Sequence, residues 1–205
     1  MTRSKSRRSQ LPLPPADIGA REPVAHVLPK GAWLSRFFNK SHHPIFFDFE
    51  GAQNRSRFNS PTGTYGVLYA AEESSGAFAE SFLRVPGRAV APDLIAAKSY
   101  ARFKLLREVR LAMLRGNGLA RIGATAEVIH CSPPYGPSQS WSQALHDHPM
   151  HFDGISYTSR HAERLCVALF DRARDASDVP IRRDNLLDDW FDELLDRDGV
   201  GVAPG

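Results

Sequence analysis

Short apolar runs divided by turn residues characterise the first half of the chain. Six aromatic residues crowd into residues 33–49, where His42, His43 and Pro44 interrupt them. Proline and the polar pair do not suit the interior of one long helix, so the pattern favours core-packing strands joined by loops.

A strand followed by a helix is the clearest local prediction. Residues 66–71 form a continuous apolar run after a turn and predict a buried strand. Ser74 or Ser75 then caps a helix that runs to about residue 84, where a Pro-Gly pair ends it.

The second half of the chain mixes strands and helices without regular alternation. In chain order we expect two strands within 100–114 around Arg107, a short helix at 119–123, a strand at 127–131, a helix from a Ser138 cap to about 148, strands at 153–158 and 165–170, and a helix capped by Asp184 with Leu187, Trp190, Phe191 and Leu194 on one face. The spacing of apolar residues over 100–114 is also compatible with a single helix, so this alternative stays open. Helices that do not alternate with strands indicate the α+β class.

Composition places the chain among ordinary globular proteins. Of its 205 residues 42% are hydrophobic and 24% charged, enough to bury a core. No stretch approaches the ~20 apolar residues of a membrane-spanning helix, and the first ten residues lack the apolar run of a secretory signal. We therefore expect a cytoplasmic protein with no membrane partner. Two cysteines, Cys131 and Cys166, are too few for a disulfide framework and are expected to be small core residues.

The positive charge lies mainly at the amino terminus. Lys and Arg number 26 and Asp and Glu 23, a net charge of +3, of which the first fifteen residues contribute +4. The rest of the chain carries −1, so direct nucleic-acid binding is not expected. Residues 1–20 are expected to be a disordered basic and Pro-rich leader, with a weak electrostatic arm for an acidic partner as the alternative. Residues 181–205 are expected to form an acidic C-terminal helix and tail.

The histidines around residue 148 are the pattern in this sequence that could suggest a metal-binding site. His146 and His148 are two residues apart, whereas metal-binding pairs on helices favour a spacing of four. Pro149 interrupts the backbone directly afterwards. We therefore expect no bound metal.

Three polar residues stand out near the predicted strand and helix. Tyr69 lies within the apolar strand, where its hydroxyl needs a partner, and Glu80 projects away from the apolar side of the helix. Arg57 lies just before the turn. Residue types and spacing alone favour a plainer interpretation, in which Glu80 pairs with residue 84 on the surface, Arg57 is solvated and Tyr69 is core.

Several motifs in a fixed order change that interpretation. They are Arg55-Ser56-Arg57-Phe58-Asn59, Gly66-Val67-Leu68-Tyr69-Ala70-Ala71, Ala77-Phe78-Ala79-Glu80-Ser81-Phe82, Tyr135-Gly136-Pro137-Ser138-Gln139-Ser140-Trp141, Asp153-Gly154-Ile155-Ser156-Tyr157-Thr158-Ser159-Arg160-His161 and Cys166-Val167-Ala168-Leu169-Phe170-Asp171. Together they resemble the RES domain family, named for its Arg, Glu and Ser. We place this domain at residues 30–175.

The resemblance implies roles for five residues, matched motif by motif. Arg57 matches the family Arg, Tyr69 the strand Tyr and Glu80 the helix Glu. Ser159 matches the family Ser better than Ser156 does, because of its spacing from Tyr157. Arg36 matches an early Arg, although the residue after it is more often Tyr or Ile.

The same resemblance implies a fold and an activity. It implies an ADP-ribosyltransferase-like α+β fold with a strand-rich core and flanking helices. It also implies an enzyme that consumes NAD+ as a glycohydrolase or phosphorylase, commonly the toxin of a toxin–antitoxin pair with an Xre-type helix-turn-helix antitoxin. NAD+ is then a substrate, with inorganic phosphate as an optional co-substrate, and no bound cofactor is expected.

The residue types at the matched positions suit cleavage of the bond between nicotinamide and ribose. Glu80 would stabilise an oxocarbenium-like state, and Arg36 and Arg57 would clamp a pyrophosphate. Tyr69 would stack on nicotinamide, and Ser159 would bond a phosphate or ribose oxygen. A protein ADP-ribosyltransferase using the same pocket and a non-catalytic module that binds nucleic acid through the leader are the alternatives. Whether the chain forms a homodimer is left open.

Overall fold

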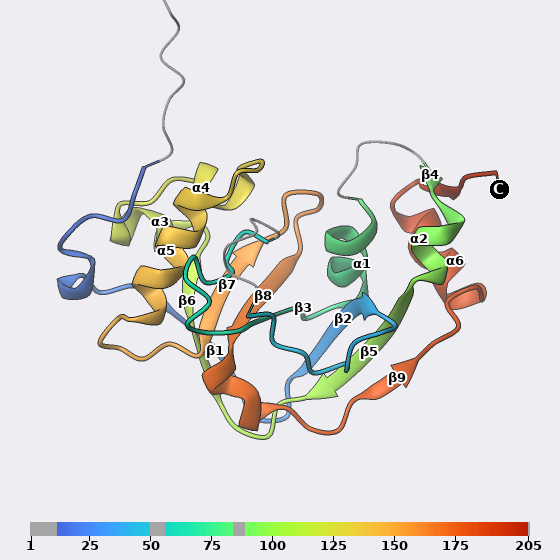
Figure 1. The fold of residues 1–205 in the computed structure, drawn as a ribbon, viewed down its shortest axis with the longest axis horizontal. Helices are drawn as coiled ribbons and strands as arrows, with labels where there is room; N and C mark the ends of the chain where they lie inside the picture. Colours follow the sequence, from blue (N-terminus) through green and yellow to red (C-terminus); the bar gives the residue numbers. More distant parts are fainter. Residues whose placement is uncertain (1–11, 50–55, 84–88, 205) are drawn as a thin grey trace, which may run out of the picture.

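The computed structural model describes residues 12–49, 56–83 and 89–204. These residues form a mixed fold of the predicted α+β class, a large sheet with helices packed on it (Figure 1). In chain order the elements are η1 (Ile18–Ala20), β1 (Ala25–Leu28), β2 (Trp33–Asn39), β3 (Val67–Ala71), α1 (Ser74–Phe82), β4 (Ala89–Val90), α2 (Pro92–Ala96), β5 (Lys98–Lys104), β6 (Val109–Leu114), α3 (Asn117–Ile122), α4 (Glu127–His130), α5 (Gly136–His146), β7 (Gly154–Thr158), β8 (Leu165–Phe170), η2 (Asp171–Ala176), β9 (Ile181–Arg183), α6 (Asp189–Arg197) and β10 (Gly201–Val202).

The large sheet has eight strands in the order β1-β6-β7-β8-β3-β2-β5-β9. Neighbouring strands are antiparallel except for β6 and β7, which are parallel. Between β2 and β3 the register consists of one pair, Ser35 and Ala71, whereas β2 pairs with β5 along its whole length. The sheet is therefore weakly joined at its centre, and β4 and β10 form a separate two-stranded sheet.

Helices gather in two groups (Figure 1). Helices α3, α4 and α5 lie near β6 and β7, and α1, α2 and α6 lie toward the β2–β5 end. Buried residues of this helical side, such as Phe78, Trp141 and Phe191, form one apolar cluster with the sheet. A second cluster on the other face includes Phe47 and Phe103, so the sheet is covered on both sides.

Alternation along β3 places Tyr69 on the helical side of the sheet. Val67 and Ala71 belong to the helical cluster, and Leu68 and Ala70 belong to the cluster on the opposite face. Tyr69 packs against the helical cluster, as the two-residue period of a strand requires. The chain then turns directly into α1, which brings Glu80 to the same side.

Most predicted elements are present. The buried strand at 66–71, the helix after it, the two strands around Arg107, the short helix near residue 120 and the strands at 153–158 and 165–170 all have counterparts. The strand predicted at 127–131 was wrong, because Glu127–His130 form a helical turn, α4. Val128 and Ile129 are neighbours and both are buried, which a half-exposed strand does not allow but a turn packed on α5 does.

Three predicted helix caps are also corrected. Helix α1 has Glu73 as its N-cap residue, with no side-chain cap bond, so Ser74 and Ser75 lie inside the helix. Helix α5 starts at Gly136, since Pro137 is tolerated in a first turn, and its Ser138 donates to the carbonyl of Val128 at 2.6 Å.

Helix α6 is capped by Asp188 instead of Asp184. The Asp188 carboxylate accepts the amide of Phe191 at 3.1 Å. Asp184 instead accepts the hydroxyl of Ser99 and the Nε of Arg182, both at 2.6 Å, because it lies beside the β5–β9 edge of the sheet.

The ends of the described chain pack on the body. Residues 1–11 of the expected leader lie outside the described residues, but Pro12 accepts the indole N–H of Trp141 at 2.7 Å and residues 18–20 form η1. The expected disorder therefore does not extend over residues 12–20. Helix α6 buries Phe191, Leu194 and Leu195 in the helical cluster, so it is part of the same core. Among the described residues, none of the helices is long and apolar enough to cross a membrane.

Candidate active site

The carboxylate of Glu80 is held by two side chains from distant parts of the chain. The Ser159 hydroxyl donates to Glu80 Oε1 at 2.7 Å, and Arg57 Nη2 donates to Oε2 at 3.2 Å. The side chains of Arg57 and Glu80 are only 10% and 13% exposed. The structure thus brings three of the predicted site residues together, and Glu80 is not the surface residue of the plainer interpretation. Residue 84, its suggested surface partner, lies outside the described residues.

Arg57 is fixed by further contacts. Its Nη1 donates to the carbonyl of Ile129, and its guanidinium lies 5.5 Å from the centre of the Tyr157 ring. Burial opposes the charged form of Arg57, but Tyr157 and Glu80 outweigh it and raise the pKa of the guanidinium above its ordinary value. Arg57 is therefore a permanent cation beside Glu80.

Tyr69 anchors the loop that carries Arg57. Its hydroxyl accepts the amide of Phe58 at 2.8 Å and donates to Asn59 Oδ1 at 3.1 Å. The amide group of Asn59, which is fully buried, donates in turn to Asp48 at 2.9 Å. The need of the Tyr69 hydroxyl for a partner is thus met by the loop itself.

Helix α5 holds the same loop from the other side. Gln139 Nε2 donates to the carbonyl of Ser56 at 3.2 Å, and the Ser142 hydroxyl donates to the carbonyl of Phe58 at 2.6 Å. Gln139 and Ser142 are both buried. Arg57 therefore sits on a loop clamped between β3 and α5.

Arg36 lies apart from this cluster, on β2. Its Nη1 donates to the carbonyls of Pro44 at 3.1 Å and Phe46 at 3.3 Å, whereas its buried Nε has no hydrogen-bond partner among the described residues. Burial lowers the pKa of Arg36 to about 10. A buried guanidinium with an unsatisfied donor gains from an anionic ligand.

Two hollows meet at Glu80 and Tyr69. The larger one, of about 440 Å³, lies where the sheet is weakly joined, and the residues around it include Arg36, Phe38, Asn39, Tyr69, Glu80 and Lys98. The smaller one, of about 200 Å³, is bordered by Arg57, Tyr69, Glu80, Tyr135, Arg160 and His161. Ser56 also borders both. The two predicted clamping arginines therefore face different hollows, Arg36 the larger and Arg57 the smaller.

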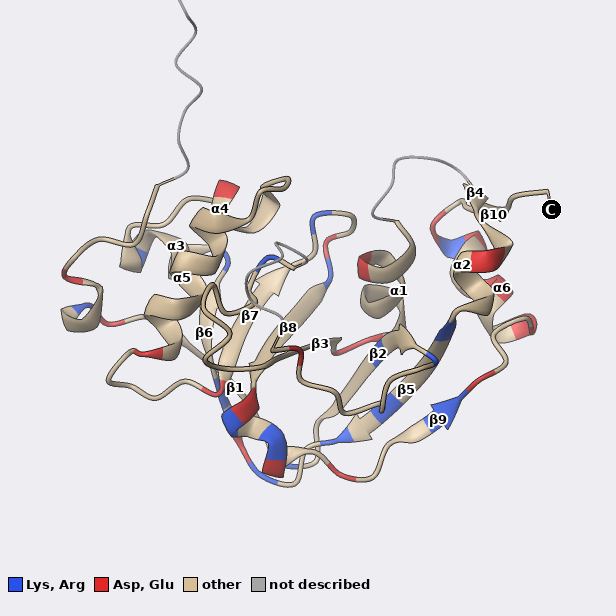
Figure 2. Cartoon of the chain, viewed as in Figure 1, with Lys and Arg blue, Asp and Glu red and all other residues tan. Residues whose placement is uncertain are grey.

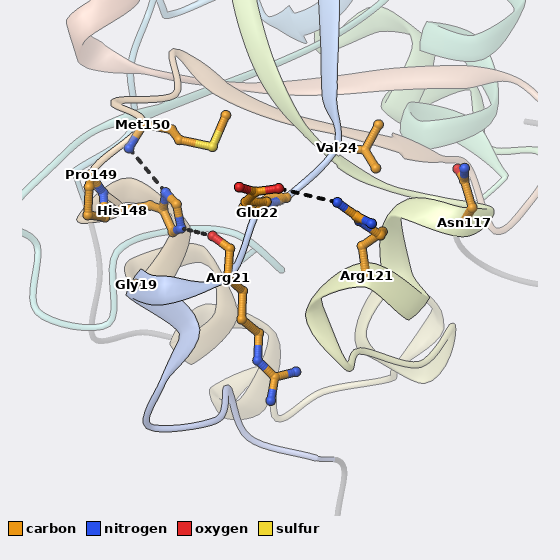
Figure 3. A pocket seen from close by; sticks show the side chains of 10 residues that line it. Gly19, Arg21, Glu22, Val24, Asn117, Arg121, His148, Pro149 and Met150 are labelled. Atoms are coloured by element: carbon orange, nitrogen blue, oxygen red, sulfur yellow. Dashed lines mark hydrogen bonds and ion pairs between the residues drawn. The ribbon is translucent and has the colours of Figure 1, made fainter.

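A third hollow, of about 590 Å³, lies away from these residues (Figure 3). Figure 3 shows it between the segment around Arg21 and Glu22, helix α3 with Arg121, and the turn at His148. His148 is buried, and its Nε2 lies 3.1 and 3.2 Å from the carbonyl oxygens of Ile18 and Arg21. This histidine therefore holds the N-terminal segment. No group of three or more His, Cys, Asp or Glu side chains within the described ranges is arranged to hold a metal ion.

Both cysteines are buried. Burial, followed by the negative charge of Glu80, raises the pKa of the Cys166 thiol well above its usual range. Cys131 Sγ lies 2.9 Å from Ser138 Oγ. Burial agrees with the expected core role, and the raised pKa argues against a Cys166 thiolate.

A family comparison covers the segment of the chain that carries these residues. The model of the RES domain family matches residues 33–190, which include all five predicted site residues. The chain belongs to the RES domain family. The match extends beyond the expected end of the domain at residue 175 and reaches into α6, in keeping with the packing of that helix in the core.

Solved structures support the fold of this RES domain. One chain of the crystal structure of the M. tuberculosis MbcT-MbcA toxin-antitoxin complex is similar with a TM-score of 0.58 and 12% sequence identity, over 83% of this chain and 92% of that one. No curated protein matches the chain. At this identity the likeness establishes the fold alone.

The sequence analysis did not identify several residues that surround Glu80, Arg57 and Ser159. Asn59 and Tyr157 lie inside the quoted motifs, and the signal that could have found them is a polar side chain within each motif that the structure shows to be buried. Arg160 and His161 follow Ser159 directly but were not singled out. Gln139 and Ser142 carried no signal, because their role depends on how α5 packs on the loop.

Proposed function

We propose that this RES domain protein is an NAD+-consuming enzyme that breaks the bond between nicotinamide and ribose. The observation that carries the proposal is the Glu80 carboxylate, which Ser159 and Arg57 orient where two hollows meet. Family membership is the second support.

The chemistry of the bond explains why a carboxylate is needed. As the glycosidic bond breaks, its electron pair moves to the ring nitrogen, so nicotinamide leaves neutral without being protonated. Positive charge develops on the ribose carbon and ring oxygen, and a nearby carboxylate stabilises that charge. The bonds from Ser159 and Arg57 hold Glu80 in one orientation before the substrate binds. Preorganisation of this kind lowers the barrier because no reorientation is required during the reaction.

The larger hollow suits the dinucleotide. Its volume of about 440 Å³ is within the range of small-molecule sites. Arg36 and Lys98 bring cationic side chains to its border, as a pyrophosphate requires. In this arrangement Tyr69, which borders both hollows, presents its ring to nicotinamide while its hydroxyl holds the loop.

We further propose that the protein is the toxin of a toxin–antitoxin pair and acts in the cytoplasm, where NAD+ is available. The similar solved structure is described as a toxin-antitoxin complex, and this supports an antitoxin partner for the chain. An Xre-type helix-turn-helix protein is the partner that we expect.

Nicotinamide release from NAD+ by the purified protein tests the enzymatic proposal. We expect Glu80→Gln, which keeps the shape but removes the charge, to lower the rate at least about 100-fold. Glu193→Gln on the exposed side of α6 is the matched control and should leave the rate unchanged. No release from the wild type, or equal release from Glu80→Gln, would overturn the proposal.

Two further readouts separate the alternatives. Transfer of label from NAD+ to protein in a cell lysate, without free ADP-ribose, identifies a protein ADP-ribosyltransferase instead. Expression in bacteria should arrest growth with the wild type and the Glu193→Gln control but not with Glu80→Gln. Growth arrest by Glu80→Gln would contradict toxicity through NAD+ cleavage.

A further inference from the structure

The C-terminal end of α6 contacts the loop that carries Ser159. Figure 2 shows basic and acidic residues both in this loop, residues 159–164 between β7 and β8, and around α6. Asp198 directly follows α6 and forms an ion pair with Arg164, the last residue of the loop. Their side chains are only 12% and 21% exposed, so salt and water screen this pair little. Asp198 lies outside the residues that the RES family model matches, 33–190.

The ion pair between Arg164 and Asp198 is bidentate. Arg164 Nη1 lies 3.1 Å from Asp198 Oδ2, and Arg164 Nη2 lies 3.1 Å from Asp198 Oδ1. Two contacts of this kind fix the orientation of a guanidinium as well as its position. Arg164 Nη1 also donates to the carbonyl of Ser75 at 3.1 Å, in the first turn of the helix that carries Glu80. One side chain therefore ties the end of α6 to the start of α1.

The backbone of Arg164 binds Ser159 itself. Its carbonyl accepts the amide of Ser159 at 2.9 Å, and its own amide donates to the carbonyl of Ala162 at 2.7 Å. The Ser159 hydroxyl then donates to Glu80 Oε1 at 2.7 Å. The side chain of Arg164 thus contacts the helix of Glu80, while its main chain contacts the residue that binds Glu80. The placement of this arginine sets how the serine meets the carboxylate.

Asp198 is itself held at a fixed helix end. Gly199 follows it with a φ of 64°, a left-handed conformation that favours glycine and commonly ends helices. The amide of Val200 donates to the carbonyl of Leu195 at 2.9 Å, and the side chain of Val200 is buried in the helical cluster. The carboxylate of Asp198 is therefore anchored to the core and does not belong to a loose tail.

These contacts act on geometry and not on the substrate. Neither Asp198 nor Arg164 is among the described residues that border the two hollows meeting at Glu80. Resting on the proposed function, we propose that Asp198 is a positioning residue for nicotinamide release, which acts through Arg164 to hold the Ser159 hydroxyl against Glu80. A displacement of about 1 Å in an active site can lower a rate about 100-fold, so loosening of this contact is measurable.

The kinetics of nicotinamide release test this role. Asp198→Asn keeps the shape of the side chain but removes its charge. We expect kcat to fall about three- to tenfold with KM for NAD+ changed less than about twofold, because the ion pair orients Ser159 and does not bind the substrate. Asp198→Glu, which keeps the charge, should restore most of the rate. Asp196→Asn on the exposed side of α6 is the matched control and should leave kcat unchanged. An unchanged kcat in Asp198→Asn overturns the proposal.

A double-mutant cycle with Ser159→Ala separates positioning from a general loss of stability. If Asp198 acts through Ser159, adding Asp198→Asn to Ser159→Ala should lower kcat by less than about twofold further. Losses that multiply as if independent overturn the proposal. Arg164→Lys is the second variant, because lysine keeps the charge but lacks the planar fork that binds both carboxylate oxygens. It should give the same pattern in the cycle, and it decides the question if Asp198→Asn does not fold.

The proposed function and the positioning role fail in different ways. Hydrogen exchange of the Ser159 amide, measured by NMR, reports on the loop without any reaction. Relative to the amide of Ala168 in β8, it should exchange at least about tenfold faster in Asp198→Asn than in the wild type. If the wild type releases no nicotinamide, the proposed function fails and this exchange measurement decides the positioning role by itself. Equal relative exchange in the two proteins overturns that role and leaves the proposed function standing.

Discussion

Two serines of the β7 segment show how one residue's surroundings decide its role. Ser159 is buried with its hydroxyl bonded to Glu80, and it also accepts the amide of His161 at 3.2 Å. Ser156 is equally buried, but its hydroxyl has no hydrogen-bond partner in the part of the chain that the structure describes. The two residues are of the same type and three positions apart, yet one lies at the site and the other in the core.

Replacement of each serine by alanine should therefore affect enzyme activity differently. Ser159→Ala removes a bond to a charged group, worth about 1.5–3 kcal/mol, and should lower kcat/KM for nicotinamide release about tenfold or more. Ser156→Ala removes a buried, unsatisfied hydroxyl, so activity should be retained and the free energy of unfolding unchanged or raised by about 1 kcal/mol. Enzyme assays and urea unfolding measure the two quantities. Equal losses of activity in both variants would contradict the assignment of Ser159.

At the scale of elements, strand β3 and helix α5 together set the position of Arg57. Tyr69 of β3 binds the amide of Phe58, and Ser142 of α5 binds its carbonyl. The Ser142 hydroxyl also accepts from Tyr65 at 2.9 Å. An arginine on an otherwise irregular loop thus obtains a fixed geometry, which the proposed catalytic role of the site requires.

Ser142→Ala should loosen this clamp. It leaves the Phe58 carbonyl and the Tyr65 hydroxyl without their partner, so the free energy of unfolding should fall by about 1–3 kcal/mol. The rate of nicotinamide release should fall as well, because Arg57 becomes less well placed. Ser140→Ala is the control on the same helix, since Ser140 bonds within α5 to the carbonyl of Gly136 at 3.0 Å. If the two variants unfold at the same urea concentration, the clamp does not stabilise the loop.

Across the whole molecule, two histidines link stability to pH, the half-buried His26 and the more exposed His130. Burial lowers the pKa of His26 and His130 below the ordinary value of 6.5, with positive charge of Arg115 beside His26 and of Arg57 and Arg160 beside His130 as the next causes. The unfolded chain therefore takes up protons before the folded one as the pH falls. The stability that these groups contribute is present above pH 6.5 and is lost below it.

We expect the Tm to fall on acidification from pH 7 to pH 5 for this reason. His130→Gln, which cannot be protonated in this range, should show a smaller fall than the wild type. Scanning calorimetry at several pH values measures both. A fall of the same size in the variant would show that His130 does not take part.

Local sequence patterns predicted the structure best where one continuous run of residues specifies one strand or helix. The apolar run of β3 and the helix after it were predictable because burial on both faces needs a continuous apolar sequence. Helix α4 was not, because two adjacent apolar residues fit a strand or a turn and its packing on α5 decides between them. The N-cap of α6 was predicted at Asp184 instead of Asp188 for a similar reason. Asp184 accepts a hydrogen bond from Ser99, which lies 85 positions away in the sequence.

From the sequence alone, the resemblance to the RES family predicted the candidate site residues and their order, because the motifs of that family are local. Only the tertiary structure decided how they meet. Arg57 and Ser159 lie 23 and 79 positions from Glu80 along the chain, and strand order, not local pattern, brings both to one carboxylate. The weak pairing of β2 with β3 and the clamp from α5 are likewise contacts between distant segments. Local residue patterns specify which side chains are polar or buried, whereas the packing of strands and helices specifies their partners.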